Sequence, residues 1–188
     1  MINGSKILLN KYPEFDEDSR TPNGLDLRLG KVYELSEEYL LYGLYEDKKI
    51  IPEHILLPEE ESNRKRLNKE KDTLETVVGW TLEPNRPYIL EVNEPITISK
   101  NSAQLYKPRS TLLRCGVTIL TAVGDAGYNG HLAFLCINYS SRPFFIEKNV
   151  RFAQLIDFEV KGNDQLYDGD FQEKIDDTDD WMDSRIEF

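Results

Sequence analysis

The sequence predicts a mainly β fold, a barrel or sandwich built from many short strands. Short apolar segments recur at close spacing along most of the chain, and Pro and Gly residues separate them. No stretch keeps a helical period over several turns, and no internal repeat is visible. Many short strands at such spacing are typical of all-β barrels and sandwiches. With 188 residues, of which 39% are hydrophobic, the chain is long enough to bury one core.

The expected elements follow from the local pattern of polar and apolar residues. Ser5 at the start of an apolar segment predicts a short helix over 5–12, capped by the Ser5 side chain. Residues 32–44 are ambiguous. Residues 56–75 are so rich in charge that we expect a solvated surface insertion, with a helix as one possible conformation. Strands are expected at 25–30, 76–82, 88–92, 96–99 and 103–106.

Two hairpins are expected in the second half of the chain. The first joins strands at 117–122 and 131–138 through the turn Asp125–Gly130, in which Asp, Asn and Gly are common turn residues. The second hairpin comprises strands at 144–147 and 151–160, with Lys148 and Asn149 between them.

Acidic residues are concentrated at the C-terminal end. The net charge is −11, and residues 162–188 hold ten Asp or Glu against two Lys or Arg, so the body before them is nearly neutral. A basic groove for polymeric nucleic acid is therefore not expected. We divide the chain into a β domain at 1–160, which includes the charged insertion at 56–75, and an acidic tail at 161–188.

Membrane segments and secretion signals are not predicted. The apolar runs are too short to span a bilayer, and the N-terminus lacks a basic segment followed by a long apolar core. The two cysteines, Cys115 and Cys136, stand in apolar strand-like segments, where we expect buried free thiols in a reducing compartment. A disulfide or a catalytic thiol is the alternative. The expected location is cytoplasmic.

Several common kinds of catalytic site have no support in the sequence. There is no Cys-x-x-Cys pair, and His54 and His131 stand without ligand-spaced partners, which argues against zinc. The zinc-deaminase signature and the Walker phosphate loop are both absent. Neither histidine accompanies a serine in a strained turn, so a serine triad is not expected.

One segment has the residue types of a phosphate site. Arg109, Ser110 and Thr111 place a guanidinium fork beside two hydroxyls, all of which can donate to phosphate oxygens. Fourteen residues after Thr111, Asp125 stands on a Gly-bounded turn with Tyr128 three residues further on. Each feature alone is ordinary. Together, phosphate donors and one carboxylate that activates water are what hydrolysis of a phosphate anhydride requires.

These residues fall in motifs that resemble those of the trimeric dUTPase and dCTP deaminase superfamily. The domain of that superfamily is the β-clip, a distorted jelly-roll-like barrel with a few short helices, so the resemblance implies this fold and a homotrimer. The similarity spans most of the chain, and the motifs occur in the family's order. The matching segments are Asn23–Gly30, Arg109–Arg114, Ala122–Gly130 with Asn138, and Val150–Ile156.

The resemblance implies a role for each matching side chain. Asp125 would activate the water that attacks the α-phosphorus, and Asp26 would help to hold the water shell of a Mg²⁺ cofactor. Tyr128 would stack on the deoxyribose and leave no room for a 2′-hydroxyl. Backbone groups of the 123–138 hairpin would pair with the edge of uracil. Further substrate contacts are implied for Arg109, Ser110, Thr111, Arg114 and Gln154 and, in the tail, Tyr167 and Gln172.

Leu135 distinguishes between the two branches of the superfamily. The deaminase branch has a glutamate at the matching place, where it serves as general acid and base, and a leucine cannot transfer a proton. We therefore expect Mg²⁺-dependent hydrolysis of dUTP, a small-molecule partner, to dUMP and pyrophosphate. The alternatives are a dCTP deaminase, a bifunctional dCTP deaminase and dUTP diphosphatase, a non-catalytic nucleotide-binding regulator, and a purely structural trimer.

The chain departs from the usual dUTPase pattern in two places. The Gly-rich phosphate lid is missing, and Tyr167–Gln172 instead resembles the Tyr-x-Gly-x-Tyr-Gln tail of deaminase-like and archaeal-type members. We expect this segment to act as the lid. In addition, Gly124 stands where the family usually has Ile, and Ala122 stands where it has Gly.

Overall fold

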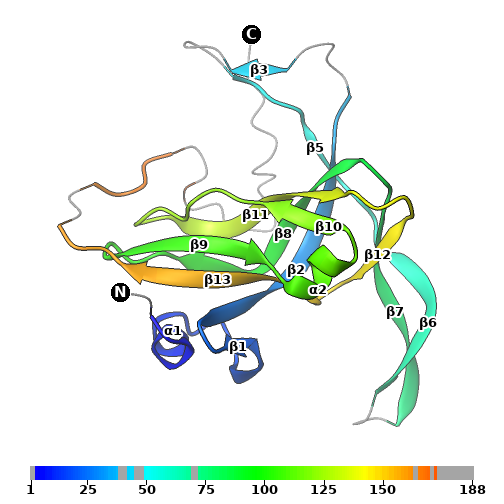
Figure 1. Cartoon of the computed structure of the whole chain (residues 1–188), viewed down its shortest axis with the longest axis horizontal. Helices are drawn as coiled ribbons and strands as arrows, with labels where there is room; N and C mark the ends of the chain where they lie inside the picture. The colour runs from blue at the N-terminus through cyan, green and yellow to red at the C-terminus, as the bar shows by residue number, and fades with distance from the viewer. Residues whose placement is uncertain are drawn as a thin grey trace.

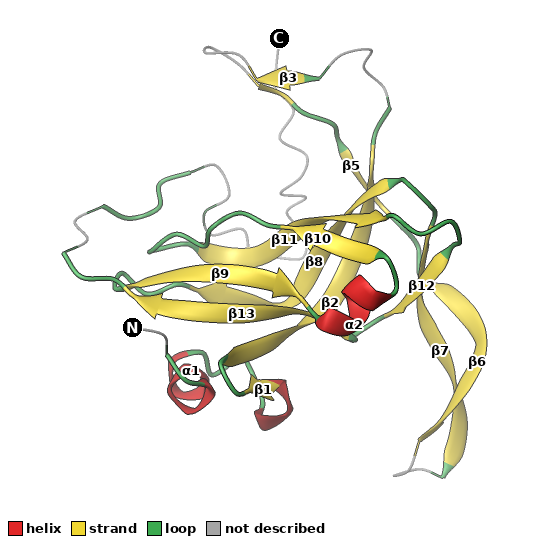
Figure 2. Ribbon diagram, in the orientation of Figure 1, coloured by secondary structure: helices red, strands yellow, loops and turns green. Residues whose placement is uncertain are grey.

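The computed structural model describes residues 3–37, 42–44, 49–68, 72–162, 165–169 and 172. Within these residues, an antiparallel eight-stranded sheet curls into a barrel-like body (Figure 1, Figure 2). Six strands follow the order β10-β11-β8-β2-β13-β9, and β1 and β5 both pair with β2. The bounds are β1 Arg20–Thr21, β2 Gly24–Leu35, β5 His54–Leu56, β8 Pro87–Thr97, β9 Ser102–Pro108, β10 Val117–Leu120, β11 Asn129–Asn138 and β13 Arg151–Glu159.

A backbone bridge brings the two ends of this strand order together. Gly124, which follows β10, pairs with Gln104 of β9 through two N–H···O bonds of 2.9 Å. The sheet thus approaches closure, which reduces the exposed strand edge. The predicted mainly β, barrel-like fold is confirmed.

Alternation of apolar side chains explains why β11 forms a central strand. Leu132, Phe134 and Cys136 are buried, whereas Ala133 and Leu135 between them are only partly covered. This period of two is the pattern of a strand with one face on a core. The predicted hairpin is also present, because β10 pairs with β11 from Val117↔Asn138 to Leu120↔Leu135.

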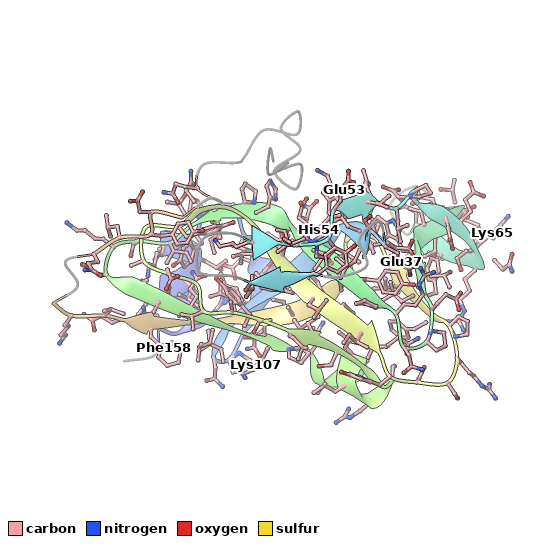
Figure 3. The ribbon with its side chains drawn as sticks, turned by 90° about the horizontal axis from the view of Figure 1, so that it is seen from above. Glu37, Glu53, His54, Lys65, Lys107 and Phe158 are labelled. Carbon is pink, nitrogen blue, oxygen red and sulfur yellow. The ribbon has the colours of Figure 1, made fainter. Side chains whose placement is uncertain are left out.

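A second sheet projects from the barrel as an arm. It consists of β6 (Glu60–Asn68), β7 (Thr73–Leu82) and β12 (Phe144–Glu147), in the order β12-β7-β6. Lys65 lies toward its outer end, far from Phe158 of the barrel (Figure 3). The charged insertion is therefore exposed as expected, but it forms a β-hairpin and not a helix.

The predicted hairpin between 144–147 and 151–160 is wrong. Both strands exist, but β12 pairs with β7 and β13 pairs with β2 and β9, so they belong to different sheets. The register along β7 runs from Phe144↔Leu82 to Glu147↔Gly79. β12 pairs with β7, which is distant in the sequence, and not with the adjacent β13. No local pattern in the sequence identifies β7 as its partner.

The helices are few and short, as expected for this fold. They are α1 (Ser5–Lys11), the 3₁₀ turn η1 (Glu17–Ser19) and α2 (Ser110–Arg114). Gly4 and not Ser5 occupies the N-cap of α1, so the predicted N-cap position at Ser5 is wrong. The strands expected at 88–92 and 96–99 form one strand, β8. A third short sheet pairs β3 (Gly43–Leu44) with β4 (Lys49–Ile50).

The two cysteines have different environments. Both are free thiols, but Cys136 is buried whereas Cys115 is exposed, so the expected burial is correct for the first and wrong for the second. Burial raises the pKa of Cys136 to about 12. Among the described residues, no helix combines the length and apolarity needed to cross a membrane.

Candidate active site

The first cluster of site residues surrounds Asp26, a buried carboxylate on β2. Its Oδ2 atom lies 3.5 Å from an Nη atom of Arg109 and 3.7 Å from one of Arg151, and its side chain is only 3% exposed. Burial raises the pKa of Asp26, and the nearby Arg109, Arg151 and Arg28 guanidinium groups oppose that shift. Asp26 is therefore a fixed counter-charge that holds two arginines at one point of the barrel.

Strand pairing brings Gln154 into the same cluster. Gln154 on β13 is the direct cross-strand partner of Asp26 on β2, and its Nε2 donates to Thr21 Oγ1 at 2.5 Å. The backbone N–H of Arg109 donates to the Phe152 carbonyl on β13 at 3.0 Å. Three of the predicted site residues, Asp26, Arg109 and Gln154, thus lie together although they are distant in the sequence.

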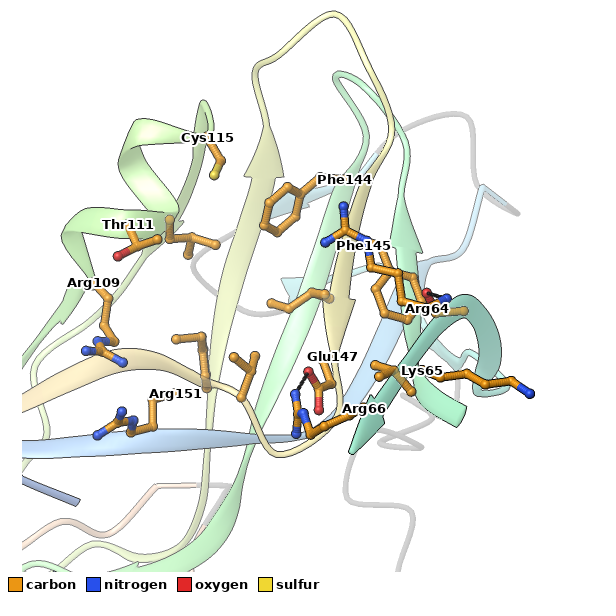
Figure 4. Close-up of a pocket in the computed structure, with 16 residues that line it drawn as sticks. Arg64, Lys65, Arg66, Arg109, Thr111, Cys115, Phe144, Phe145, Glu147 and Arg151 are labelled. Atoms are coloured by element: carbon orange, nitrogen blue, oxygen red, sulfur yellow. Dashed lines mark hydrogen bonds and ion pairs between the residues drawn. The ribbon is translucent and has the colours of Figure 1, made fainter. Parts of the chain in front are cut away.

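Arg109 and Arg151 also line a groove between α2 and the β6–β7 arm (Figure 4). Its volume is about 540 Å³, which is within the range of small-molecule sites. The other charged lining residues are Arg64, Lys65, Arg66 and Glu147, and the remaining lining is mostly aliphatic and aromatic. An anion could therefore enter a cationic groove with an apolar floor.

The remaining predicted residues of α2 differ in their placement. Ser110, Thr111 and Arg114 are all exposed, but only Thr111 lines the groove. Arg114 is the last residue of the helix.

The second cluster is the turn that presents Asp125. The Tyr128 N–H donates to the Asp125 carbonyl at 3.2 Å, and Gly127 between them has φ +87°, which suits the third position of a type II turn. Ile98 on the neighbouring chain segment accepts from Gly127 N–H at 2.9 Å and donates to the Tyr128 carbonyl at 2.8 Å. The turn is thus held on both sides, and the Asp125 side chain is exposed to solvent.

The departure at Gly124 has a structural explanation. A Cβ atom at this position would lie 2.2 Å from Tyr106 Oη and 2.8 Å from Ile98 Cδ1, so the tyrosine hydroxyl fills the space that a side chain would need. The Tyr106 hydroxyl donates to Gln104 Oε1 at 2.6 Å. Burial raises the pKa of Tyr106 well above its ordinary value, which keeps the hydroxyl protonated as a donor.

This hydrogen bond belongs to a buried network beneath the turn. Gln104 Nε2 donates to the Tyr12 hydroxyl at 2.8 Å, and Tyr12 donates to Asp157 Oδ2 at 2.6 Å. Lys11 forms an ion pair with Asp157 at 3.0 Å. Gln104, Tyr12 and Asp157 are all fully buried, so their polar groups are satisfied within the protein.

The described part of the tail rests on the same turn. The backbone N–H of Tyr167 donates to the Ala126 carbonyl at 2.8 Å, and its ring lies edge-on to Tyr128 with centroids 5.4 Å apart. Gln172 Nε2 donates to the Gly127 carbonyl at 2.9 Å, and its Oε1 accepts from Asn129 N–H at 3.3 Å. Residues 173–188 of the acidic tail lie outside the described residues.

Within one chain, the two clusters do not form a single site. Gly124 and the Asp125 turn lie beside Gln104 near the start of β9, whereas Arg109 follows its last residue. Arg109 is five positions after Gln104, a separation of about 16 Å at 3.3 Å per residue of extended strand. The structure brings Asp125, Tyr128 and the tail together, and separately Asp26, Arg109 and Gln154.

Metal ligands are not gathered in the described part of the chain. No group of three or more His, Cys, Asp or Glu residues that could hold an ion is found there. Asp26 faces two guanidinium groups at its Oδ2 atom, which already compensate its charge. The donor set therefore fits a hydrated ion that is held mainly by a phosphate ligand, which is a common mode for Mg²⁺, and not a protein cage.

The sequence interpretation missed the basic residues that complete the first cluster. Arg151 stands in the matching Val150–Ile156 motif, and its motif position could have identified it. Arg64 lies in an insertion interpreted as a surface segment without chemistry. Only the fold shows that this insertion returns to the groove lined by Arg109.

The fold and these two clusters define a β-clip domain with an arginine-rich groove and a separate, structured aspartate turn. Comparison with known proteins then gives the family. The chain belongs to the dCTP deaminase-like family, whose sequence model matches residues 2–160. The predicted resemblance to the dUTPase and dCTP deaminase superfamily is thereby confirmed.

Two named archaeal relatives align with this chain over about nine tenths of its length. A protein of Methanopyrus kandleri named probable deoxyuridine 5′-triphosphate nucleotidohydrolase is 34% identical over 91% of this chain and 99% of its own length. A protein of the same name from Methanothermobacter thermautotrophicus is 34% identical over 92% and 100%. The crystal structure of 2′-deoxycytidine 5′-triphosphate deaminase from Agrobacterium tumefaciens is 18% identical, with a TM-score of 0.55 over 83% of this chain and 47% of that one. This structure supports the fold alone.

Proposed function

We propose that this chain hydrolyses dUTP to dUMP and pyrophosphate, with Asp125 as the base that activates water. The names of the two archaeal relatives favour this activity within the family. The observation that carries the proposal is the structured turn, which exposes one carboxylate next to an aromatic side chain. A carboxylate fixed in this way can orient a water molecule and accept its proton.

The surroundings of Leu135 argue against deamination. On β11, Leu135 pairs with Ile89 of β8 and with Leu120 of β10, which forms a row of apolar residues across the sheet. No group at this position can donate or accept a proton. The uncharged row favours hydrolysis over the deaminase alternative.

In the proposed reaction, the arginine cluster binds the triphosphate. Arg109, with Ser110, Thr111 and Gln154 nearby, would donate to phosphate oxygens, and Asp26 would keep the guanidinium group of Arg109 in place. Asp26 would also hold the water shell of a Mg²⁺ ion that arrives with the nucleotide. That ion would supply charge neutralisation at the phosphates.

We further propose that the complete site forms between copies of the chain in a homotrimer. The support is the separation of the two clusters along β9, which prevents Asp125 and Arg109 of one chain from meeting on one triphosphate. In this arrangement Tyr128 would exclude a 2′-hydroxyl. The described tail residues Tyr167 and Gln172 would close over the nucleotide, and Arg114 would contact it from the end of α2.

The test is pyrophosphate release from each dNTP in the presence of Mg²⁺. We expect release from dUTP, and a loss of at least a hundredfold in kcat for Asp125→Asn with dUTP binding retained. Asp72→Asn, on the distant β6–β7 turn, removes the same charge and serves as the control. Turnover by Asp125→Asn near the unmodified rate would exclude Asp125 as the base, and ammonia release from dCTP would support the deaminase alternative.

Mixed oligomers test the shared site. Asp125→Asn and Arg109→Ala chains should each be inactive alone and regain part of the activity after co-refolding, because one interface then combines two intact clusters. No recovery, with mixed oligomers confirmed by mass, would contradict a site shared between copies.

A further inference from the structure

The strand β6 departs from regular pairing beside the cationic groove. Glu61 pairs with Val78 and Lys65 with Thr76, so residues 62–64 face a single residue of β7. Such bulges bend a strand, re-aim its side chains and occur often next to active sites. Ser62 and Arg64 of the bulge both line the groove.

The bulge gives neighbouring basic residues different directions. The Arg64 guanidinium points toward the groove from the wall opposite Arg109, whereas the Lys65 ammonium points away (Figure 4). Arg66 is occupied by an ion pair with Glu147 at 2.5 Å. Among the residues that the structure describes, Arg64 has no such ion-pair partner.

The balance of charge around the groove favours an anionic ligand. Five basic residues and one carboxylate line it, in a chain whose net charge is −11. Local accumulation of cations in an acidic protein raises the local concentration of anions. The apolar floor lowers the local dielectric, so each cation interacts more strongly with a bound phosphate than it would in water.

We propose that Arg64 binds the terminal phosphate of the nucleotide, as the far wall of a groove in which Arg109 and Arg151 bind the inner phosphates. This inference rests on the proposed function and extends it to a residue outside the family motifs. Water adds to the α-phosphorus, the bond to the bridging oxygen breaks, and pyrophosphate leaves with that oxygen. Arg64 then holds this leaving group and sets the preference for a triphosphate over a shorter chain.

The test compares Arg64→Ala with Lys6→Ala, which removes the same charge at an exposed position of α1 that does not line the groove. We expect Arg64→Ala to raise the KM for dUTP and the inhibition constant of inorganic pyrophosphate about tenfold, the effect of losing one charge-assisted hydrogen bond. Inhibition by dUMP should not change, because dUMP lacks the outer phosphates. Lys6→Ala should change each value less than twofold, and Arg64→Lys should restore part of the loss.

Two readouts separate failure of this inference from failure of the proposed function. Calorimetry measures the affinity of the groove for inorganic pyrophosphate without any turnover. Weaker binding by Arg64→Ala therefore supports the inference even if the chain does not cleave dUTP. Equal pyrophosphate affinity of Arg64→Ala and Lys6→Ala, with both variants folded by circular dichroism, would overturn it.

Discussion

Replacing Asp26 with Asn separates the role of this carboxylate in stability from its role in the site. Asn keeps the shape of the side chain and removes its charge. Because burial raises the pKa of Asp26, the folded state disfavours the charged form. The native chain therefore binds more protons than the unfolded chain between the unfolded and the folded pKa, and the free energy of unfolding falls as pH rises through that window.

The stability of Asp26→Asn relative to the original chain should depend on pH. Below the unfolded pKa of about 3.9 the carboxyl is neutral in both states, so Asp26→Asn should match the original chain. Above the window, Asp26→Asn should be as stable or more stable. The arginines that lose their counter-charge are 36% and 40% exposed, so their loss of pairing should cost no more than about 1 kcal/mol.

The effect on activity should be opposite. Without Asp26, Arg109 loses the carboxylate that fixes its guanidinium, and the KM for dUTP should rise about tenfold, the low end for a hydrogen bond to a charged group. Urea unfolding from pH 3 to 8 measures the free energy of unfolding, and pyrophosphate-release kinetics measure the KM. A destabilisation above about 2 kcal/mol at pH 7, or an unchanged KM, would refute this account of Asp26.

Two further predictions concern packing and thiol chemistry. Gly124→Ala should lower the free energy of unfolding by about 1–3 kcal/mol, because the new methyl group overlaps the Tyr106 hydroxyl. Adding Tyr106→Phe should recover part of that loss in urea unfolding, and strictly additive losses would contradict the clash. At pH 8, iodoacetamide should modify exposed Cys115 and leave buried Cys136 unmodified until denaturant is added. Mass spectrometry that finds two modified thiols in the native chain would contradict this burial.

Local patterns in the sequence were sufficient for most strands and for the general fold. The alternation in β11 predicts both its conformation and its buried face, and the turn residues at Asp125–Gly130 predict the hairpin. Motif resemblance then identified Asp26, Arg109 and Gln154, which the structure places together.

Long-range pairing explains what the sequence could not predict. The partner of β12 is β7, more than sixty residues away in the chain, and no local signal favours it over the adjacent β13. The position of Arg64 was unpredictable for the same reason. A charged segment is predicted to be solvent-exposed whether or not its strand bends back toward a site. The Gly124 position likewise depends on Tyr106, a residue on another strand.

The network that joins Lys11 and Tyr12 to Gln104 has a practical consequence for protein engineering. The first helix is a support for the aspartate loop, since its side chains complete the hydrogen bonds that hold Gln104 and, through it, the Tyr106 hydroxyl under Gly124. The other end of the chain contacts that loop directly through Gln172. Fusion partners and truncations at either end should therefore disturb the turn that presents Asp125.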